Sequence, residues 1–154
     1  MRNVDARVTV STDKAVLGSG QRFAVVGRRV EQGTEYRVRA RFTSDGAVHL
    51  DAVRVVGGVE TVLGAEVTVA GLEHDAGEPI SLRVRFLGAS PTTITAKAWS
   101  ARREEPDAWQ LERTDSQSAL QAAGAVGLRA DLLTPTLNAP VTFAVDSLQV
   151  SSPK

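Results

Sequence analysis

Hydrophobic and polar residues alternate along most of this chain with a period close to two. In the stretch TEYRVRARF, residues 34–42, apolar residues occupy one parity and three arginines occupy the other. This period is typical of β-strands that bury one face and expose the other. We predict ten such strands: 5–11, 21–30, 35–43, 48–56, 60–63, 80–87, 93–100, 109–114, 125–132 and 141–150.

Turn signals separate these runs, for example SDG at 44–46 and GASP at 88–91. Only residues 115–123, DSQSALQAA, suggest a helix, and Gly124 follows at once, so one or two turns at most are expected. Many short strands without intervening helices predict an all-β fold, a two-sheet antiparallel sandwich that forms a single domain over residues 1–154.

The parity also predicts which side chains face the core and which face outward. Tyr36, Val38, Ala40 and Phe42 form a natural inward set on one strand, and Leu82, Val84 and Phe86 form another. The opposite parities carry cations and one large aromatic residue. These outward residues are Arg37, Arg39, Arg41, Arg83, Arg85, Lys97 and Trp99.

The composition narrows the classes of function. Lys plus Arg equals Asp plus Glu, at 18 each, so no global field attracts nucleic acid or an acidic membrane. No apolar stretch approaches the roughly 18 residues of a membrane span, and the N-terminus alternates in place of showing a signal peptide. Cysteine is absent, which excludes disulfides and thiolate chemistry. We therefore expect neither nucleic-acid binding nor membrane insertion.

Candidate catalytic groups are sparse. His74 lies between Glu73 and Asp75, but this segment is predicted to be a solvated surface loop in which neighbouring side chains point apart. His49 and Asp51 share one parity on a strand, yet a metal would need at least one more ligand. No G-x-S-x-G elbow and no phosphate loop are present. The sequence therefore predicts no enzymatic activity.

Several stretches in combination resemble a known family. They are GQRFAVVGRRV at 20–30, TEYRVRARFTSDGAVHLDAVRVVGGVET at 34–61, PISLRVRFLGASPTTITAKAW at 79–99, EPDAWQLERTD at 105–115, LQAAGAVGL at 120–128 and APVTFAVDSLQV at 139–150. The chain resembles laminin G-like domains of the concanavalin A-like lectin/glucanase superfamily, of the type found in exported or surface proteins of actinobacteria and in tail proteins of their phages.

The resemblance implies a jelly-roll sandwich in a secreted, cell-surface or virion protein, with an outer face that holds saccharide in lectin and glucanase relatives. Two departures from the family matter. The paired carboxylates of glucanases, spaced E-x-D-x-E on one strand, are absent. The chain also begins near what resembles an early-middle strand, which leaves open whether N-terminal edge strands are lacking or are supplied by a neighbouring chain.

The resemblance also implies one metal site. In glucanase-like relatives an Asp in the last strand helps to bind a structural calcium, and Asp146 occupies that place here. Calcium takes about six to eight oxygen ligands, and the sequence does not identify the others. The alternative is that Asp146 caps a turn or pairs with an arginine. The sequence therefore predicts no cofactor, and calcium is the one candidate if a metal is bound.

We interpret the chain as a non-catalytic glycan-binding or adhesion module. Its ligand, an acidic glycan or cell-surface polysaccharide, would lie across the seven outward residues, with arginines binding acidic groups and Trp99 stacking on a sugar ring. Two alternatives remain. The arginines can simply be solvated and paired with acids, or the domain can be a structural spacer that assembles through an open sheet edge with itself or a neighbouring domain.

Overall fold

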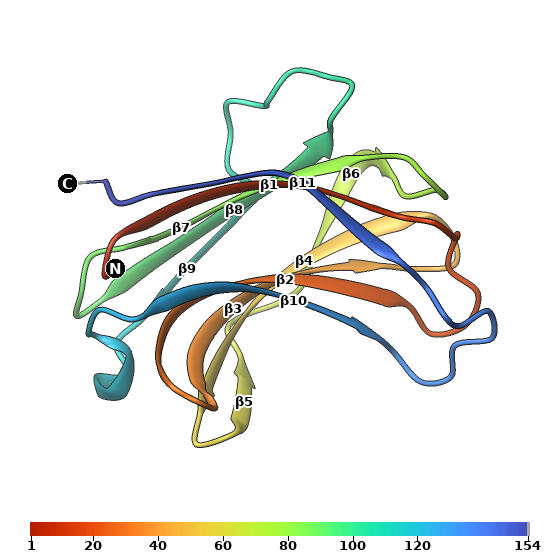
Figure 1. Ribbon diagram of the computed structural model, residues 1–154. Helices are drawn as coiled ribbons and strands as arrows, with labels where there is room; N and C mark the ends of the chain where they lie inside the picture. Colours follow the sequence, from red (N-terminus) through yellow and green to blue (C-terminus); the bar gives the residue numbers. More distant parts are fainter. Residues whose placement is uncertain (154) are drawn as a thin grey trace.

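A computed structural model describes residues 1–153, which form two antiparallel β-sheets packed face to face (Figure 1). Sheet A has the strand order β11-β1-β7-β8-β9, and sheet B has the order β10-β2-β3-β4-β5, with β6 also paired to β4. The strands are β1 (Val4–Thr12), β2 (Gln21–Glu31), β3 (Thr34–Phe42), β4 (Ala47–Val56), β5 (Val59–Val62), β6 (Val67–Glu73), β7 (Ile80–Leu87), β8 (Thr92–Ser100), β9 (Leu111–Asp115), β10 (Ala125–Leu132) and β11 (Phe143–Ser151).

The predicted all-β antiparallel sandwich is confirmed, and each of the ten predicted strands is present. Alternating burial follows the predicted parity on β1, β3 and β7, whose inward residues join one hydrophobic core. Tyr36 of sheet B stacks on Phe86 of sheet A with ring centroids 6.2 Å apart, so the two layers meet through the predicted inward sets. The first strand, β1, is flanked on its two sides by β11 and β7.

The structure differs from the predicted elements in two places. Residues 67–73, which lie between two predicted strands, form β6 at the edge of sheet B. Gly71 has a positive φ of 73°, which disrupts the alternation of Val67 and Val69 before Leu72. The helix predicted over 115–123 is limited to a 3-10 turn, Ser118–Leu120, because β9 extends as far as Asp115.

Buried polar groups close one end of the sandwich. Arg28 is fully buried and donates to the carbonyl oxygens of Arg2, Gly88 and Leu120 and to the Thr92 hydroxyl. Nearby, the buried Asp115 carboxylate accepts from the Tyr36 hydroxyl at 2.6 Å and from Arg54 at 2.6 Å. Polar groups without contact to water need such partners, so these contacts fix the relative position of strands from the two sheets.

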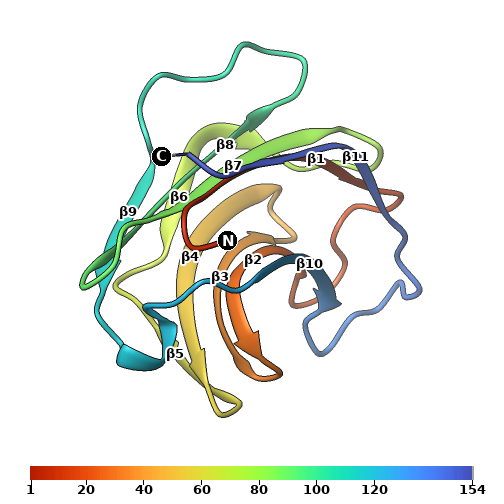
Figure 2. The ribbon, with the colours of Figure 1, turned by 60° about the vertical axis from the view of Figure 1, so that its left-hand side comes forward.

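Three long connections lie at the end of the sandwich or outside it. Segment 13–20, from β1 to β2, and segment 133–142, from β10 to β11, cross between the layers at the same end of the sandwich (Figure 1). The connection 101–110, between β8 and β9, stands out beyond sheet A (Figure 2). Within residues 1–153 no helix has the length and apolar character needed to cross a membrane.

Candidate functional site

The seven residues predicted to form one ligand-binding surface lie in different parts of the molecule. Arg37, Arg39 and Arg41 project from β3 on the outer face of sheet B, whereas Arg83, Arg85 and Lys97 belong to β7 and β8 of sheet A. Because the inward parities of both sheets face the common core, the two outer faces point in opposite directions. The prediction of one continuous surface is therefore wrong: parity gives the face of a strand but not its sheet.

The arginines of sheet B are paired with acids from neighbouring strands. Arg39 makes two hydrogen bonds to the Asp51 carboxylate, at 2.8 and 2.6 Å. Arg41 binds Glu66 in the same two-bond manner, at 3.0 and 2.6 Å. Arg37 donates to Glu35 and to Glu60, each at 2.9 Å. The side chains of Arg37 and Arg39 are only 11% exposed, so these ion pairs leave little positive charge open to solvent.

The register between β2 and β3 places two arginines opposite each other, so acidic partners are needed to offset their repulsion. Arg22 on β2 lies directly opposite Arg41 on β3, an arrangement of like charges that destabilises a strand pair. Asp131 on β10 accepts two hydrogen bonds from Arg22, at 3.0 and 2.6 Å, while Glu66 accepts from Arg41. Interleaved acids therefore neutralise these arginines, as the alternative of arginines paired with acids predicts.

The outer face of sheet A carries a second ion-pair cluster. Asp5 on β1 accepts two hydrogen bonds from Arg83, at 3.0 and 2.8 Å, and one from Arg85 at 2.9 Å. Glu105, from the 101–110 connection, binds Arg83 at 2.7 Å and Lys97 at 2.8 Å. Every predicted cation on this face has a carboxylate partner.

The aromatic residue that contacts these cations is Trp109, whereas the sequence predicted Trp99 as the aromatic residue of this surface. The Trp109 ring lies under Lys97, Arg85 and Arg83, with the charged groups 4.6, 5.1 and 5.7 Å from the ring centroid. These distances are in the range of cation–π contacts. The connection 101–110 thus folds back on sheet A through Glu105 and Trp109, and it covers part of the predicted surface.

The segment Glu73-His74-Asp75 is only partly the solvated loop that the sequence predicts. Glu73 and Asp75 are exposed, but His74 is buried and stacks on Phe42 with ring centroids 4.3 Å apart. Its Nε2 lies 2.8 Å from the Thr12 hydroxyl. Because that hydroxyl donates its own proton to the Lys14 carbonyl, Nε2–H must be the donor to Thr12. The buried Nδ1 therefore carries no proton, and it has no hydrogen-bond partner among residues 1–153.

Several of these groups have shifted pKa values. Burial lowers the pKa of His74, because protonation would place an unpaired N–H in the core. The hydrogen bond from Arg83 lowers the pKa of Asp5, and that from Arg41 lowers the pKa of Glu66. Burial opposes the shift of Glu105, but the hydrogen bonds from Lys97 and Arg83 outweigh it and lower its pKa.

We expect the free energy of unfolding to fall in two stages as the solution is acidified. A group whose pKa is lower in the folded state contributes stability above its unfolded pKa and loses it as the pH falls. His74 therefore produces a first decline below about pH 6.5, and Asp5, Glu66 and Glu105 produce a second below about pH 4. Urea denaturation at a series of pH values measures both stages.

The variant His74→Phe is the matched control for the first stage, since it keeps an aromatic ring on Phe42 and removes the titrating group. Stability of this variant should be flat between about pH 7 and pH 5, with the acid stage unchanged. A first decline that persists in His74→Phe would show that another group causes it.

The part of the chain that the structure describes does not provide enough ligands for a metal at either predicted place, at His49 and Asp51 or at Asp146. His49 and Asp51 do lie on the same outer face, but His49 contacts Thr68 and Thr43 while Asp51 binds Arg39. Asp146 is exposed on β11 beside the bulge at Ser147. Among residues 1–153 no group of three His, Asp or Glu side chains could hold a metal ion. The predicted calcium role of Asp146 is thus unsupported.

A groove of about 630 Å³ lies where β6, the end of β8 and the 101–110 connection meet. Two contacts hold its walls in place. The Gln110 side chain pairs with the backbone N–H and carbonyl of Ala98, at 2.8 and 3.0 Å, and Arg102 binds Glu78 at 2.9 Å. Sequence analysis missed this groove because the residues around it come from three segments, one of them the unpredicted β6.

The residues around the groove combine an aromatic side chain, carboxylates and apolar residues. Trp99, one of the seven predicted residues, is half-buried and lines the groove. Val69 and Leu72 supply apolar surface from β6. The exposed acidic residues along the groove are Glu73, Asp75, Glu78 and Glu104, and Arg103 adds one cation. Such a lining offers an apolar platform beside several hydrogen-bond acceptors.

Comparisons with known proteins identify the fold and no family. No family model matches the chain, and no curated protein matches it. The structure is similar to that of a mutant of the GH43 protein BlXynB from Bacillus licheniformis, with a TM-score of 0.61 at 12% identity, over 99% of this chain and 28% of that one. It is also similar to sheep galectin-11 in complex with glycerol, with a TM-score of 0.50 at 12% identity, over 98% of this chain and 91% of that one.

These similarities support a jelly-roll sandwich architecture, which is the fold that the sequence resemblance implies. The chain spans about a quarter of the length of the GH43 protein, and it spans almost the whole of the galectin. Proteins that share a fold can have different activities, because activity depends on the residues of particular sites. In this protein the groove and the two charged faces are the candidate sites.

Proposed function

We propose that this domain is a carbohydrate-binding module that uses the groove beside Trp99. The observation that carries the proposal is the combination of a half-buried indole with several exposed carboxylates along one groove. An indole packs against the C–H face of a sugar ring, while carboxylates accept hydrogen bonds from its hydroxyl groups. The groove volume of about 630 Å³ falls in the range of roughly 300–1,000 Å³ that is usual for small ligands.

Two further facts support carbohydrate as the ligand class. The structural neighbours, a galectin and a GH43 protein, represent folds that serve glycan binding and glycan chemistry. The groove is also mixed in character, since both polar and apolar residues line it, and a sugar presents both kinds of surface.

The charges favour a neutral glycan over the acidic glycan that the sequence suggested. Acidic side chains outnumber cations along the groove, so a uronate or sulfate there would meet repulsion. The arginines that were expected to attract such groups each bind a carboxylate of the protein itself. An acidic polymer would have to displace those acids to gain the same hydrogen bonds.

We propose further that the module binds without hydrolysing its ligand. Retaining and inverting glycosidases need two carboxyl groups placed on either side of one glycosidic bond. The chain lacks the E-x-D-x-E strand of glucanases, and its groove carboxylates come from β6, the loop after it and the 101–110 connection. Incubation with the bound oligosaccharide should leave its length unchanged by mass spectrometry.

Replacement of Trp99 by alanine should weaken binding about tenfold or more, because the stacking surface for the sugar ring is lost. A glycan array identifies the ligand, and titration calorimetry of the best neutral oligosaccharide measures the affinity. The matched variant Arg41→Ala, on the outer face of sheet B, should change the affinity less than about twofold. Unchanged affinity in Trp99→Ala, or a large loss in Arg41→Ala, would place the site elsewhere.

A further inference from the structure

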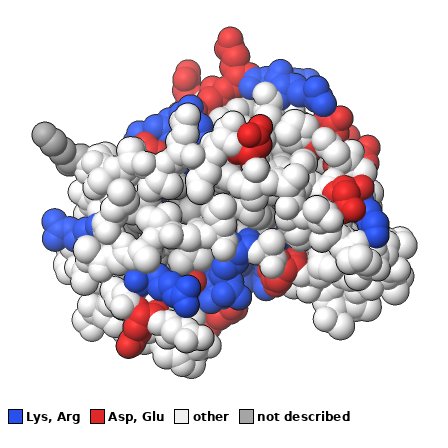
Figure 3. All heavy atoms as spheres, in the orientation of Figure 1, with Lys and Arg blue, Asp and Glu red and all other residues white. Residues whose placement is uncertain are grey.

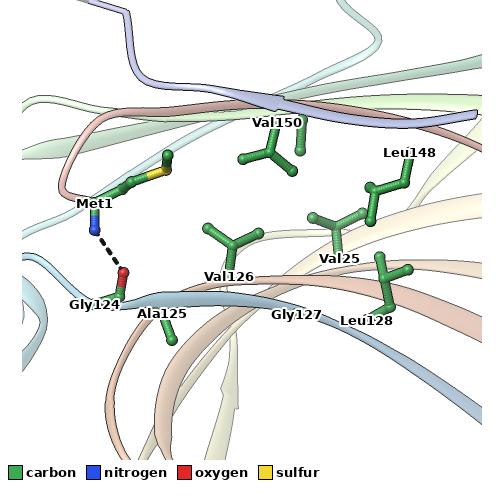
Figure 4. A pocket seen from close by; sticks show the side chains of 10 residues that line it. Met1, Val25, Gly124, Ala125, Val126, Gly127, Leu128, Leu148 and Val150 are labelled. Atoms are coloured by element: carbon green, nitrogen blue, oxygen red, sulfur yellow. Dashed lines mark hydrogen bonds between the residues drawn. The ribbon is translucent and has the colours of Figure 1, made fainter.

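The sandwich is not covered along the side between its edge strands β10 and β11. Both strands direct apolar side chains into the gap between the sheets, yet these side chains stay partly exposed. On β11, Val145, Leu148 and Val150 are 45%, 48% and 37% exposed. Val145 and Val150 pair with inward residues of β1, and Leu148 points into the gap (Figure 4). An inward-facing apolar row of this kind is normally buried in a sandwich.

The gap deepens into a pocket of about 340 Å³ between the two layers (Figure 4). Val126 and Leu128 of β10 point toward Leu148 and Val150 of β11 across it. The floor reaches Ala6 and Val25, two fully buried core residues. The other lining residues are Met1, Gly124, Ala125 and Gly127. No side chain around the pocket is polar, and an apolar cavity of this kind disfavours water and accepts apolar molecules.

Hydrogen bonds between the two layers bound the gap at its ends. At one end the N-terminal amino group of Met1 donates to the Gly124 carbonyl at 2.8 Å, and the Gly124 N–H donates back to Met1 at 3.1 Å. At the other end, segment 133–142 is bonded to segment 13–20, for example through Lys14 to the carbonyl of Asn138 at 2.9 Å. A long polypeptide strand therefore cannot run through the gap, whereas a short ligand can enter from the open side.

The edges of the two strands are poorly suited to adding a further strand. The pairing of β11 with β1 is interrupted between Arg7 and Thr9, and that of β10 with β2 between Ala125 and Gly127. Bulges of this kind protect sheet edges from pairing. Charge gives no alternative attraction, because a broad band free of Lys, Arg, Asp and Glu separates the charged groups on this face of the molecule (Figure 3).

We propose that the pocket between β10 and β11 is a binding site for a short aliphatic chain. The apolar side chains of the lining favour a ligand without polar groups along its length, and the bounded ends favour a short one. The volume lies at the low end of the range for small-molecule sites, roughly 300–1,000 Å³. Occupation of the pocket would cover Leu148 and Val150, two of the inward residues of β11 that the protein leaves partly exposed. This site is separate from the groove beside Trp99, with which it shares no residue.

Titration with 1-octanol tests the proposal, with methyl groups of the protein observed by NMR. We expect saturable shifts centred on Val25, Val126, Leu128, Leu148 and Val150. The ligand 1,8-octanediol has the same chain and a second hydroxyl group that would have to be buried, so it should bind about tenfold more weakly or worse. Equal binding of the two compounds, or the absence of saturable shifts in this pocket, would overturn the proposal.

Two variants complete the test. Leu148→Asp places a charge in the pocket mouth at a residue that is already half exposed, and it should weaken 1-octanol binding about tenfold or more. Leu137→Asp changes an exposed leucine outside the pocket, and it should leave binding unchanged. Unchanged binding in Leu148→Asp would contradict the proposal. A stable dimer in light scattering that buries these methyl groups would also contradict it, since a second copy would then be the occupant.

Discussion

Replacement of Arg28 by methionine should lower the free energy of unfolding by about 3–5 kcal/mol. The guanidinium group is fully buried and donates to three backbone carbonyls and to the Thr92 hydroxyl. Methionine keeps most of the side-chain volume but leaves those acceptors without donors. The carbonyls belong to Arg2, Gly88 and Leu120, so the loss should loosen segments from both sheets together. Urea denaturation measures the effect.

The adjacent Arg29 provides the control for this prediction. Its side chain is 48% exposed and lies 3.7 Å from Glu35, so Arg29→Met should change stability by no more than about 0.5 kcal/mol. Arg28 has a positive φ of 50°, but methionine carries the same backbone strain as arginine and the comparison isolates the hydrogen bonds. If the two variants lost stability equally, the hydrogen bonds of Arg28 would not be the cause.

Replacement of Asp115 by alanine should cost about 3 kcal/mol of stability. The carboxylate accepts from the buried Tyr36 hydroxyl and from Arg54, each at 2.6 Å, and also from the Gln117 N–H at 3.2 Å. Burial, and then the neighbouring Asp115 carboxylate, hold the pKa of Tyr36 well above its usual value, so the hydroxyl remains a donor. Removal of the carboxylate leaves that donor and the guanidinium without an acceptor.

Asp131 is the matched carboxylate, because it accepts two hydrogen bonds from a single arginine but is 42% exposed. Asp131→Ala should cost less than about 1 kcal/mol, since water replaces the lost partner. A double-mutant cycle between Asp115→Ala and Tyr36→Phe should show a clear coupling energy, as expected for direct partners. Purely additive effects would mean that the Tyr36–Asp115 contact contributes little.

The periodicity of the sequence was enough to predict the fold, because alternation directly reflects the burial of one strand face. Where the backbone leaves that pattern, the prediction fails. At Gly71 the positive φ breaks the alternation of β6, so a real strand was interpreted as a loop. His74 follows that strand, and its burial against Phe42 was missed for the same reason. Local pattern therefore identifies regular strands and overlooks bulged ones.

The candidate site was less predictable, because it depends on how strands assemble into layers. Parity placed Arg39 and Arg83 on outward faces, and both are outward, but it could not show that their strands belong to different sheets. It also could not show that distant acids neutralise them: Asp5 reaches Arg83 across 78 residues of sequence. Trp99 was predicted to face outward among the cations, but it lies half-buried along a groove whose other residues come largely from β6 and the 101–110 connection.

The most direct test of the proposed function is chemical-shift mapping with a neutral oligosaccharide chosen from a glycan array. We expect saturable shifts of the Trp99 indole and of backbone amides in β6 and residues 101–110, which surround the groove. Shifts centred on Arg37, Arg39 and Arg41 would contradict it, because they would move the ligand to the outer face of sheet B. An array on which only acidic glycans bind would contradict it equally.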